Sequence, residues 1–259
     1  MYNKRSRTLA AIFRNSFAAL VLSAGLFTAV SAQESFYYPQ PQAAAFKVPA
    51  PSAPAAALRA AGYLSQAQLQ IKDFPAPPAA GSAEDKADLA AVLQWQKDRT
   101  QDQCDAALAQ SDESFLSFFG DVNPFPVPLP AEAAAFFKRI DKETGDANRY
   151  IKKIYQRERP FLRSPELDPC LGRVQGFSYP SGHAAVSHLF GLILSDLLPR
   201  QGSIFMRAAD QGALNRVIGG VHHPSDIEAG KRLGDRLYRE LRQNQAFVAD
   251  TEALGRLLR

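Results

Sequence analysis

The sequence predicts an all-α fold, a single-domain helical bundle around one central buried helix at about residues 184–198. Segments with helical spacing of apolar residues alternate with proline-rich breaks. No stretch of any length alternates apolar and polar residues as a half-buried strand does. The run from Ala184 to Leu198 is apolar on nearly all sides, so it belongs in the middle of a core rather than on its surface.

The first 32 residues predict a secretory signal peptide. A basic start is followed by an apolar run over residues 17–30 and by small residues, so cleavage is expected near Ala32-Gln33. The run is short for a membrane span, and no later stretch is long and apolar enough for one. We expect a soluble periplasmic or secreted protein without stable membrane insertion after cleavage, and a retained anchor is the alternative. The formal net charge of +4 comes from this segment, which removes the argument for a nucleic-acid partner.

Residues 33–72 are rich in proline, alanine and glutamine and show no sustained period. This composition predicts an N-terminal arm that lies on the surface or packs against a partner subunit. The helical domain is then expected over residues 73–259.

The first long helix of that domain is expected from Ser82 to about Ala109, because Ser82 can cap its start and Glu84 and Asp85 lie in its first turn. Its inward residues are expected to be Leu89, Val92, Leu93, Trp95 and Leu108.

A short helix over residues 111–119 comes next, followed by a loop over residues 122–130 whose prolines exclude a helix. A second long helix is expected from Ala131 to about Arg157. Its inward residues are expected to be Ala135, Phe136, Ile140, Ile151 and Ile154.

Beyond the central helix, another helix is expected over residues 204–221. Ser225 and Glu228, three positions apart, predict a capping box at the start of a further amphipathic helix through Leu241. A short helix near Leu257 completes the all-α pattern.

Cys104 and Cys170 are the two cysteines of the chain. Neither has the spacing of a metal motif, and no cysteine and histidine pattern for zinc is present, so no metal site is expected. Two separate thiols and one disulfide are equally compatible with the sequence, and the expected export favours the disulfide.

A candidate anion site lies where a loop turns into the central helix, at Ser181-Gly182-His183. The start of a helix offers free backbone N–H groups and the positive end of its dipole. Ser181 adds a hydroxyl, Gly182 lets the backbone come close to a ligand, and His183 adds a titratable ring. Taken alone, His183 is equally explained as a histidine that merely starts a helix.

Two further stretches carry charged or titratable side chains at fixed spacing. Lys152 is followed after six residues by Arg159, which precedes a proline and is pushed out of the helical region. Seven positions are two helical turns, so Lys152 and Arg159 are expected on roughly the same face. Arg216 is followed after five residues by His222 and after three more by Asp226. Singly, each has a structural explanation, such as a solvated basic helix face.

In order and spacing, these three stretches resemble the tripartite signature of the type 2 phosphatidic acid phosphatase superfamily. Within it, the chain looks most like the bacterial class A non-specific acid phosphatases, over the region from about Asp73 to Leu241. The resemblance implies an acid phosphatase that needs no metal or cofactor and hydrolyses small phosphate monoesters. Members often self-associate, so a homo-oligomer is one expectation. The chain departs from the family pattern at Asn215, where a serine is usual.

The resemblance also implies a role for each side chain. His222 is expected to attack phosphorus and form a phosphohistidine, Asp226 to fix its tautomer, and His183 to protonate the leaving alcohol. The residues expected to bind the phosphoryl group are Lys152, Arg159, Ser181, Gly182 and Arg216. Because one imidazole must be charged and the other neutral, we expect a bell-shaped pH profile on the acid side.

Two other functions fit the same residues. A vanadium-dependent haloperoxidase would hold vanadate in the same cradle, the set of five residues expected to bind the phosphoryl group. Such enzymes, however, resemble larger chains with further site residues. A non-catalytic phosphate-binding protein would keep the cradle without the chemistry, and the pairing of His222 with Asp226 argues against it. The preferred alcohol is left open, because the loops that would contact it have no derivable shape.

Overall fold

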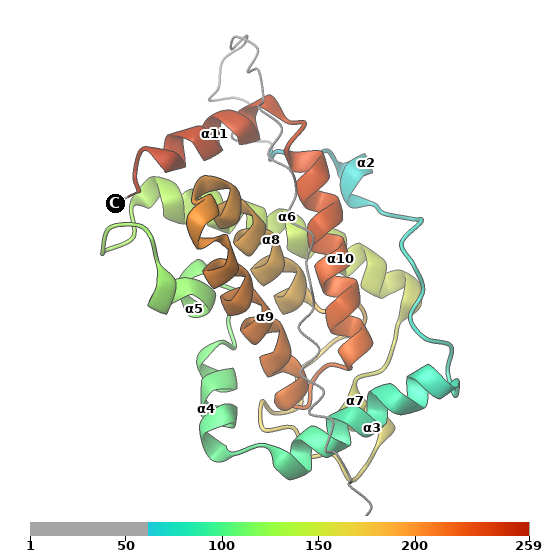
Figure 1. The fold of residues 1–259 in the computed structure, drawn as a ribbon. Helices are drawn as coiled ribbons and strands as arrows, with labels where there is room; N and C mark the ends of the chain where they lie inside the picture. Colours follow the sequence, from blue (N-terminus) through green and yellow to red (C-terminus); the bar gives the residue numbers. More distant parts are fainter. Residues whose placement is uncertain (1–61, 259) are drawn as a thin grey trace, which may run out of the picture. The chain divides into compact units, whose positions relative to one another are not determined.

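The computed structural model describes residues 62–258, which contain helices and no strand, so the predicted all-α fold is confirmed. Figure 1 labels the α-helices. They are α2 (Gln66–Leu69), α3 (Ala83–Asp98), α4 (Gln101–Ala109), α5 (Phe115–Phe119), α6 (Ala131–Tyr155), α7 (Pro160–Arg163), α8 (Gly182–Leu197), α9 (Gly202–Ile218), α10 (Pro224–Leu241) and α11 (Gln245–Gly255). Within residues 62–258, no helix has both the length and the apolar character required to cross a bilayer.

Helix α8 is the central helix that the sequence predicts. Its side chains are buried without a break from Ala184 to Gly191, and Ile193 and Leu194 continue the buried surface. Helices α6, α9 and α10 pack around it (Figure 1). A helix enclosed on these sides has a fixed N-terminus, which is where the candidate anion site lies.

Helix α10 approaches α8 closely because two of its glycines face that helix. A Cβ added at Gly230 would lie 2.5 Å from the carbonyl oxygen of Ser181 and 2.8 Å from the Cβ of Ala184. A Cβ added at Gly234 would lie 3.0 Å from the carbonyl oxygen of Ala185. These neighbours are backbone or methyl groups of a buried helix and have little room to move, so the close contact depends on glycine.

The first long helix expected from the sequence is two helices. Ser82 caps α3 as predicted, but Arg99 is extended and Thr100 begins α4, with its hydroxyl accepting from the Gln103 amide N–H at 3.3 Å. A threonine followed three residues later by glutamine is a capping box, so the break had a signal in the sequence. Leu108, which was expected to point inward, is 45% exposed.

Helix α6 ends earlier than predicted because Gln156 adopts a left-handed conformation, with φ of 48°. Arg159 is extended and precedes α7, as expected before a proline. The prediction that Lys152 and Arg159 share a helix face is therefore wrong, since the chain has left the helix between them. Two residues predicted to point inward from α6 are exposed: Ala135 and Ile154.

Helix α10 begins at Pro224 with His223 as its N-cap, so the predicted capping box of Ser225 and Glu228 is wrong. The carboxylate of Asp226 accepts from the His223 backbone N–H at 2.8 Å and takes the place expected of Glu228. A proline at the first helical position favours this earlier start.

Residues 62–72, which the composition assigns to the arm, pack on the helices. Tyr63 and Ile71 are buried in the core, and the Tyr63 backbone N–H donates to the Glu143 carboxylate of α6 at 2.5 Å. In the described chain, packed structure therefore begins before the predicted boundary at residue 73. The predicted signal peptide and the rest of the arm fall within residues 1–61, outside the described residues.

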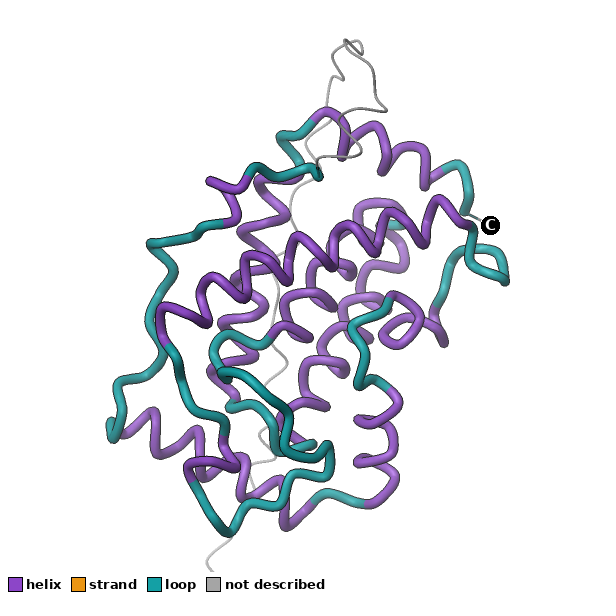
Figure 2. Tube along the Cα trace, turned by 180° about the vertical axis from the view of Figure 1, so that it is seen from behind, coloured by secondary structure: helices purple, strands orange, loops and turns teal. Residues whose placement is uncertain are grey.

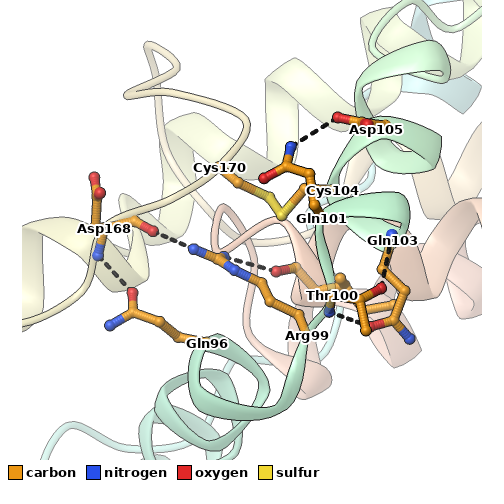
Figure 3. Close-up of a disulfide and its surroundings, with 10 residues drawn as sticks. Gln96, Arg99, Thr100, Gln101, Gln103, Cys104, Asp105, Asp168 and Cys170 are labelled. Atoms are coloured by element: carbon orange, nitrogen blue, oxygen red, sulfur yellow. Dashed lines mark hydrogen bonds between the residues drawn. A yellow bond between two sulfur atoms is a disulfide. The ribbon is translucent and has the colours of Figure 1, made fainter.

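Cys104 and Cys170 form a disulfide, with their Cα atoms 5.9 Å apart (Figure 3). It joins α4 to the long loop between α7 and α8, residues 164–181, which is among the teal segments in Figure 2. Beside it, the Arg99 guanidinium donates to the Asp168 carbonyl oxygen of this loop at 2.6 Å. The loop that leads into α8 is thus tied to the elements that precede it in the sequence.

Candidate active site

The three stretches singled out in the sequence meet at the N-terminal end of α8. The Ser181 backbone N–H donates to the Asp226 carbonyl oxygen at 2.9 Å, which joins the starts of α8 and α10. The guanidinium of Arg159 lies 3.3 Å from the ring of His222. Parts of the chain that are far apart in sequence therefore form one buried polar site.

Arg159 is held by carbonyl oxygens of two loops. Its Nε donates to Gly176 at 3.0 Å, and its two NH groups donate to Gln175 at 3.1 Å and to Val221 at 2.8 Å. The NH1 group also lies 3.3 Å from Nε2 of His222. Because a guanidinium can only donate, this contact requires a lone pair on Nε2, and the ring proton is then on Nδ1.

His222 is buried and neutral. Burial is the main reason that its pKa lies well below the usual value; the positive charges of Arg159 and Lys152 lower the pKa further, while Asp226 opposes them. Its Nδ1 lies 3.4 Å from Oδ2 of Asp226, which faces the ring proton. A neutral imidazole with its lone pair on Nε2 is the form that can act as a nucleophile.

Asp226 has no exposed surface, and its carboxylate accepts from several groups. Oδ2 accepts from the Ser178 hydroxyl at 2.5 Å and from the His223 backbone at 2.8 Å, and Oδ1 accepts from Arg157 at 2.7 Å. Burial alone would raise the pKa of Asp226, but hydrogen bonds from His222 and His223 hold it well below its usual value. The carboxylate is therefore ionised.

Arg157 connects Asp226 to helix α3. While NH1 donates to Asp226, NH2 donates to Asp85 at 3.0 Å and to Asp88 at 2.8 Å. Arg163 donates to the second oxygen of Asp85 at 2.7 Å. Buried charges persist only when they are paired and hydrogen-bonded, so this network fixes the carboxylate that faces His222.

The start of α8 has the form expected of an anion site. Ser181 is the N-cap, and its hydroxyl accepts from the Ala184 amide N–H at 3.3 Å, which leaves its O–H free to donate to a ligand. Gly182 is the first residue of the helix. A Cβ added there would lie 2.8 Å from Oε1 of Glu113, so an anionic oxygen already lies close to this helix terminus.

His183 contacts the linker between α4 and α5. The short helix predicted to begin near Ser111 begins only at Phe115, and the linker before it contacts the ring. Nε2 lies 3.1 Å from the carbonyl oxygens of Gln110 and Ser111, and Nδ1 lies 2.8 Å from Oε1 of Glu113. Carbonyl oxygens only accept, so Nε2 carries a proton, and Nδ1 faces the carboxylate.

Lys152 and Arg216 bring buried positive charge to the site. The Lys152 ammonium donates to the Ser178 carbonyl oxygen at 3.1 Å, and burial, with a contribution from Arg159, lowers its pKa to about 7. Burial also lowers the pKa of Arg216 to about 10. Arg216 is 4% exposed, and its Nε and NH1 atoms have no hydrogen-bond partner among the described residues. Cations that are buried in this way are stabilised by a bound anion.

Asn215, at the position where the family usually has serine, forms a hydrogen bond to the linker before α5. Its side-chain amide donates to the Gln110 side chain at 2.7 Å, which ties α9 to the linker that contacts His183. The substitution for the usual serine therefore supports the surroundings of His183.

Several residues of the site were missed by the sequence prediction. They are Asp85, Asp88, Glu113, Arg157, Arg163, Ser178 and His223. Asp85 and Asp88 had a signal, because they share the buried face of α3 with Val92 at spacings of three and four residues. Glu113 had none, since it lies in a linker without periodicity.

The described residues also line a cavity that lies away from these side chains. This cavity of about 440 Å³ lies between α6 and α11, lined by Phe136, Arg139, Asp250 and others, and it contains none of the predicted residues. Within residues 62–258, no group of three acidic, cysteine or histidine side chains is arranged to hold a metal ion.

The family comparison matches residues 144–235 to the PAP2 superfamily, which covers every predicted side chain from Lys152 to Asp226. This part of the chain is a PAP2 superfamily domain. The chain is 38% identical over 102 residues to a non-specific acid phosphatase of Salmonella typhi, across 37% of this chain and 40% of that protein. It is 28% identical over 197 residues to a non-specific acid phosphatase of Providencia stuartii, across 71% of this chain and 78% of that protein.

The chain thus spans about two fifths of the length of the Salmonella relative. Among solved structures, the first bacterial vanadium-dependent iodoperoxidase superposes with a TM-score of 0.52 at 16% identity, across 71% of this chain and 55% of that chain. At this identity, the likeness shows a shared fold.

Proposed function

We propose that this protein is an acid phosphatase that hydrolyses a broad range of phosphate monoesters through a phosphohistidine intermediate at His222, without a metal ion. The relatives named non-specific acid phosphatase support the activity. The neutral, nucleophilic form of His222 supports the intermediate. Three buried cations supply the charge that a metal provides in other phosphatases.

The observation that carries this proposal is the Arg216 guanidinium, whose Nε and NH1 atoms have no hydrogen-bond partner among residues 62–258. These two atoms are buried, and a buried cation in that state costs stability unless an anion binds. Burial alone would raise the pKa of Glu113, but His183, Lys152 and Arg216 lower it, so all three side chains act on the same carboxylate. A tetrahedral phosphoryl group fits this concentration of donors, with the fork of Arg216 on two of its oxygens.

The reaction proceeds in two displacements. In the first, Nε2 of His222 attacks phosphorus, the ester P–O bond breaks as the P–N bond forms, and the leaving oxygen takes the proton from Nδ1 of His183. In the second, a water oxygen attacks phosphorus and gives a proton to Nδ1 of His183. The P–N bond breaks, phosphate leaves, and the lone pair of His222 is restored. Asp226 stabilises the positive charge that develops on His222.

This scheme predicts activity on the acid side of neutrality. The depressed pKa of His222 keeps the nucleophile neutral in acidic buffer, so the acid limb of the profile lies low. Lys152 loses its proton as the pH rises through about 7, so phosphate binding weakens there. Activity that is greatest in alkaline buffer contradicts the proposal.

A chromogenic phosphate monoester tests the activity, and a phosphorus-labelled ester quenched in base tests the intermediate. We expect His222→Ala to lower kcat by at least about a thousandfold and to abolish the labelled histidine. His188→Gln is the matched control, because His188 is a buried histidine of α8 that pairs with Asp235 outside the site. Chelator is expected to leave the rate unchanged. A chain that carries no label while it turns over rules out the covalent route.

The same preparation separates the alternatives. Oxidation of bromide by peroxide with added vanadate, without ester hydrolysis, would assign the chain to the haloperoxidases. Phosphate binding without either reaction would make it a binding protein. A panel of nucleotides, sugar phosphates and aryl phosphates then measures the breadth of substrates.

We also propose export, with removal of residues 1–32. The order of basic, apolar and small residues in this segment supports it, and a disulfide fits an oxidising compartment. Amino-terminal sequencing of the mature protein tests this: a start near Gln33 agrees with export, and a retained Met1 contradicts it.

A further inference from the structure

The carboxylate of Glu113 lies at the point where the proposed reaction needs an empty position. Its Oε1 lies 2.8 Å from Nδ1 of His183, the atom that hands its proton to the leaving oxygen. A Cβ built on Gly182 would lie 2.8 Å from this same oxygen, so the carboxylate also lies against the first residue of α8. Nδ1 of His183 and the first residue of α8 thus both lie against one carboxylate oxygen.

The charges around Glu113 come from several helices. They are His183 on α8, Lys152 on α6 and Arg216 on α9, which lower the pKa of Glu113, and Asp141 on α6. Arg159 is a further neighbour: burial lowers its pKa, and the charge of Glu113 opposes that shift. The negative charge of Glu113 also acts on Asp141, whose pKa rises to about 6 through burial and through this neighbour. Glu113 is therefore ionised and lies within the electrostatic reach of the proposed phosphate ligands.

The linker that carries Glu113 is anchored on both sides. Helix α4, which precedes the linker, is joined to the loop between α7 and α8 by the Cys104–Cys170 disulfide. After it, the Phe115 ring stacks on Phe137 of α6 with centroids 4.1 Å apart. The side chain of Glu113 itself is 32% exposed, so it can leave the cradle toward solvent while the anchored linker stays in place.

We propose that Glu113 is an internal competitor of the substrate: in the ligand-free protein its carboxylate occupies the position of the leaving oxygen on His183, and a phosphate monoester must displace it. This inference rests on the proposed function, because it assumes that the cradle receives a phosphoryl group. Until the substrate arrives, the Glu113 carboxylate occupies the hydrogen-bonding position at Nδ1 of His183. The Glu113 carboxylate also raises the concentration of phosphate needed to fill the site, since two anions cannot share one position.

Calorimetric titration of the full chain with inorganic phosphate, in acidic buffer, tests the proposal without requiring turnover. We expect Glu113→Ala and Glu113→Gln to bind phosphate about tenfold more tightly than the wild type, because the competing charge is gone. Asp112→Asn is the matched control: it removes an equal charge from an exposed neighbouring residue and is expected to change the affinity less than about twofold.

The outcomes separate this inference from the function on which it rests. Equal or weaker phosphate binding by both Glu113 variants, with wild-type binding intact, overturns the role of Glu113 alone. Tighter binding in a chain that hydrolyses no ester supports Glu113 as a competitor while the catalytic proposal fails. If phosphate binds to none of the proteins, the cradle itself is wrong and both proposals fall. Thermal unfolding of each variant checks that it is folded.

Discussion

At the scale of single residues, the position of Asp226 is explained by its partners. The distance of 3.4 Å to His222 is long, whereas Ser178, His223 and Arg157 are all closer. The carboxylate is therefore fixed by groups other than the ring that it faces. Hydrogen bonds from His222 and His223 keep it ionised, and Arg157, which lies outside the sequence motif, extends its contacts to α3.

Arg157→Gln tests this positioning role. Removing a positive charge beside Asp226 lets the pKa of His222 rise, so the acid limb of the activity profile is expected to move to higher pH. We expect kcat to fall by about 10- to 100-fold with little change in KM, because the substrate is not touched. Breaking a buried network also costs about 3 to 5 kcal/mol of stability, so activity is measured well below the unfolding temperature.

Two further variants serve as controls. Arg157→Lys keeps the positive charge but loses the planar, two-pronged guanidinium, so the acid limb of its pH profile is expected to move less than that of Arg157→Gln. Arg149→Gln removes an exposed arginine of α6, which pairs with Asp146 at the surface, and is expected to leave the profile unchanged. A wild-type pH profile in Arg157→Gln would show that the residue serves stability alone.

At the scale of helices, the contact between α8 and α10 positions the site. Gly230 lets the two helices approach at Ser181, and Ser181 in turn bonds to the Asp226 backbone. The proposed anion-binding helix terminus and the carboxylate that faces His222 are thus both positioned by a single helix crossing. A change at this crossing should affect stability and activity together.

Gly230→Ala is expected to destabilise the protein by about 1 to 3 kcal/mol, because the added methyl group would lie 2.5 Å from a backbone oxygen. We also expect kcat to fall, since Ser181 must shift. Gly120→Ala is the matched control, because a Cβ at Gly120 meets nothing within 4 Å and its φ is −51°. Denaturant unfolding and ester hydrolysis measure both effects, and equal stability of the two variants contradicts the prediction.

The sequence predicted the helices better than the contacts between them. Ser82 and Ser181 marked helix starts because capping is a local interaction, and the apolar run after Ser181 marked the central helix because burial on all sides excludes polar residues. The break at Thr100 was missed although its capping signal was local. Glu113 could not be found, because its contact with His183 spans 70 residues and depends on how a linker folds.

At the scale of the whole molecule, the site extends beyond the PAP2 domain. The family match covers residues 144–235, yet Asp85 and Asp88 of α3 complete the buried network, and Glu113 contacts His183. The part of the described chain before the matched region therefore contributes to the candidate site. Asp85 and Asp88 are themselves buried, and low exposure strengthens the electrostatic interactions of the network.

The buried cations also couple stability of the whole molecule to pH and to anions. The folded-state pKa of Lys152 is depressed to about 7, so the cost of burying its charge is present below that pH and is relieved as the pH rises toward the ordinary value of lysine. A bound anion offsets this cost while the ammonium is charged. Anion-dependent stabilisation is therefore expected to be largest in acidic buffer.

Sulfate is a suitable probe, because it remains a dianion across the range in which Lys152 titrates. At about a hundred times its dissociation constant, sulfate is expected to raise Tm by about 5 to 10 °C in acidic buffer, relative to chloride at equal ionic strength. The gain should shrink as the pH passes about 7, because Lys152 becomes neutral. Lys152→Gln should remove most of this pH dependence and leave a smaller gain from Arg159 and Arg216. A sulfate effect that is the same in acidic and alkaline buffer would mean that Lys152 does not face the bound anion.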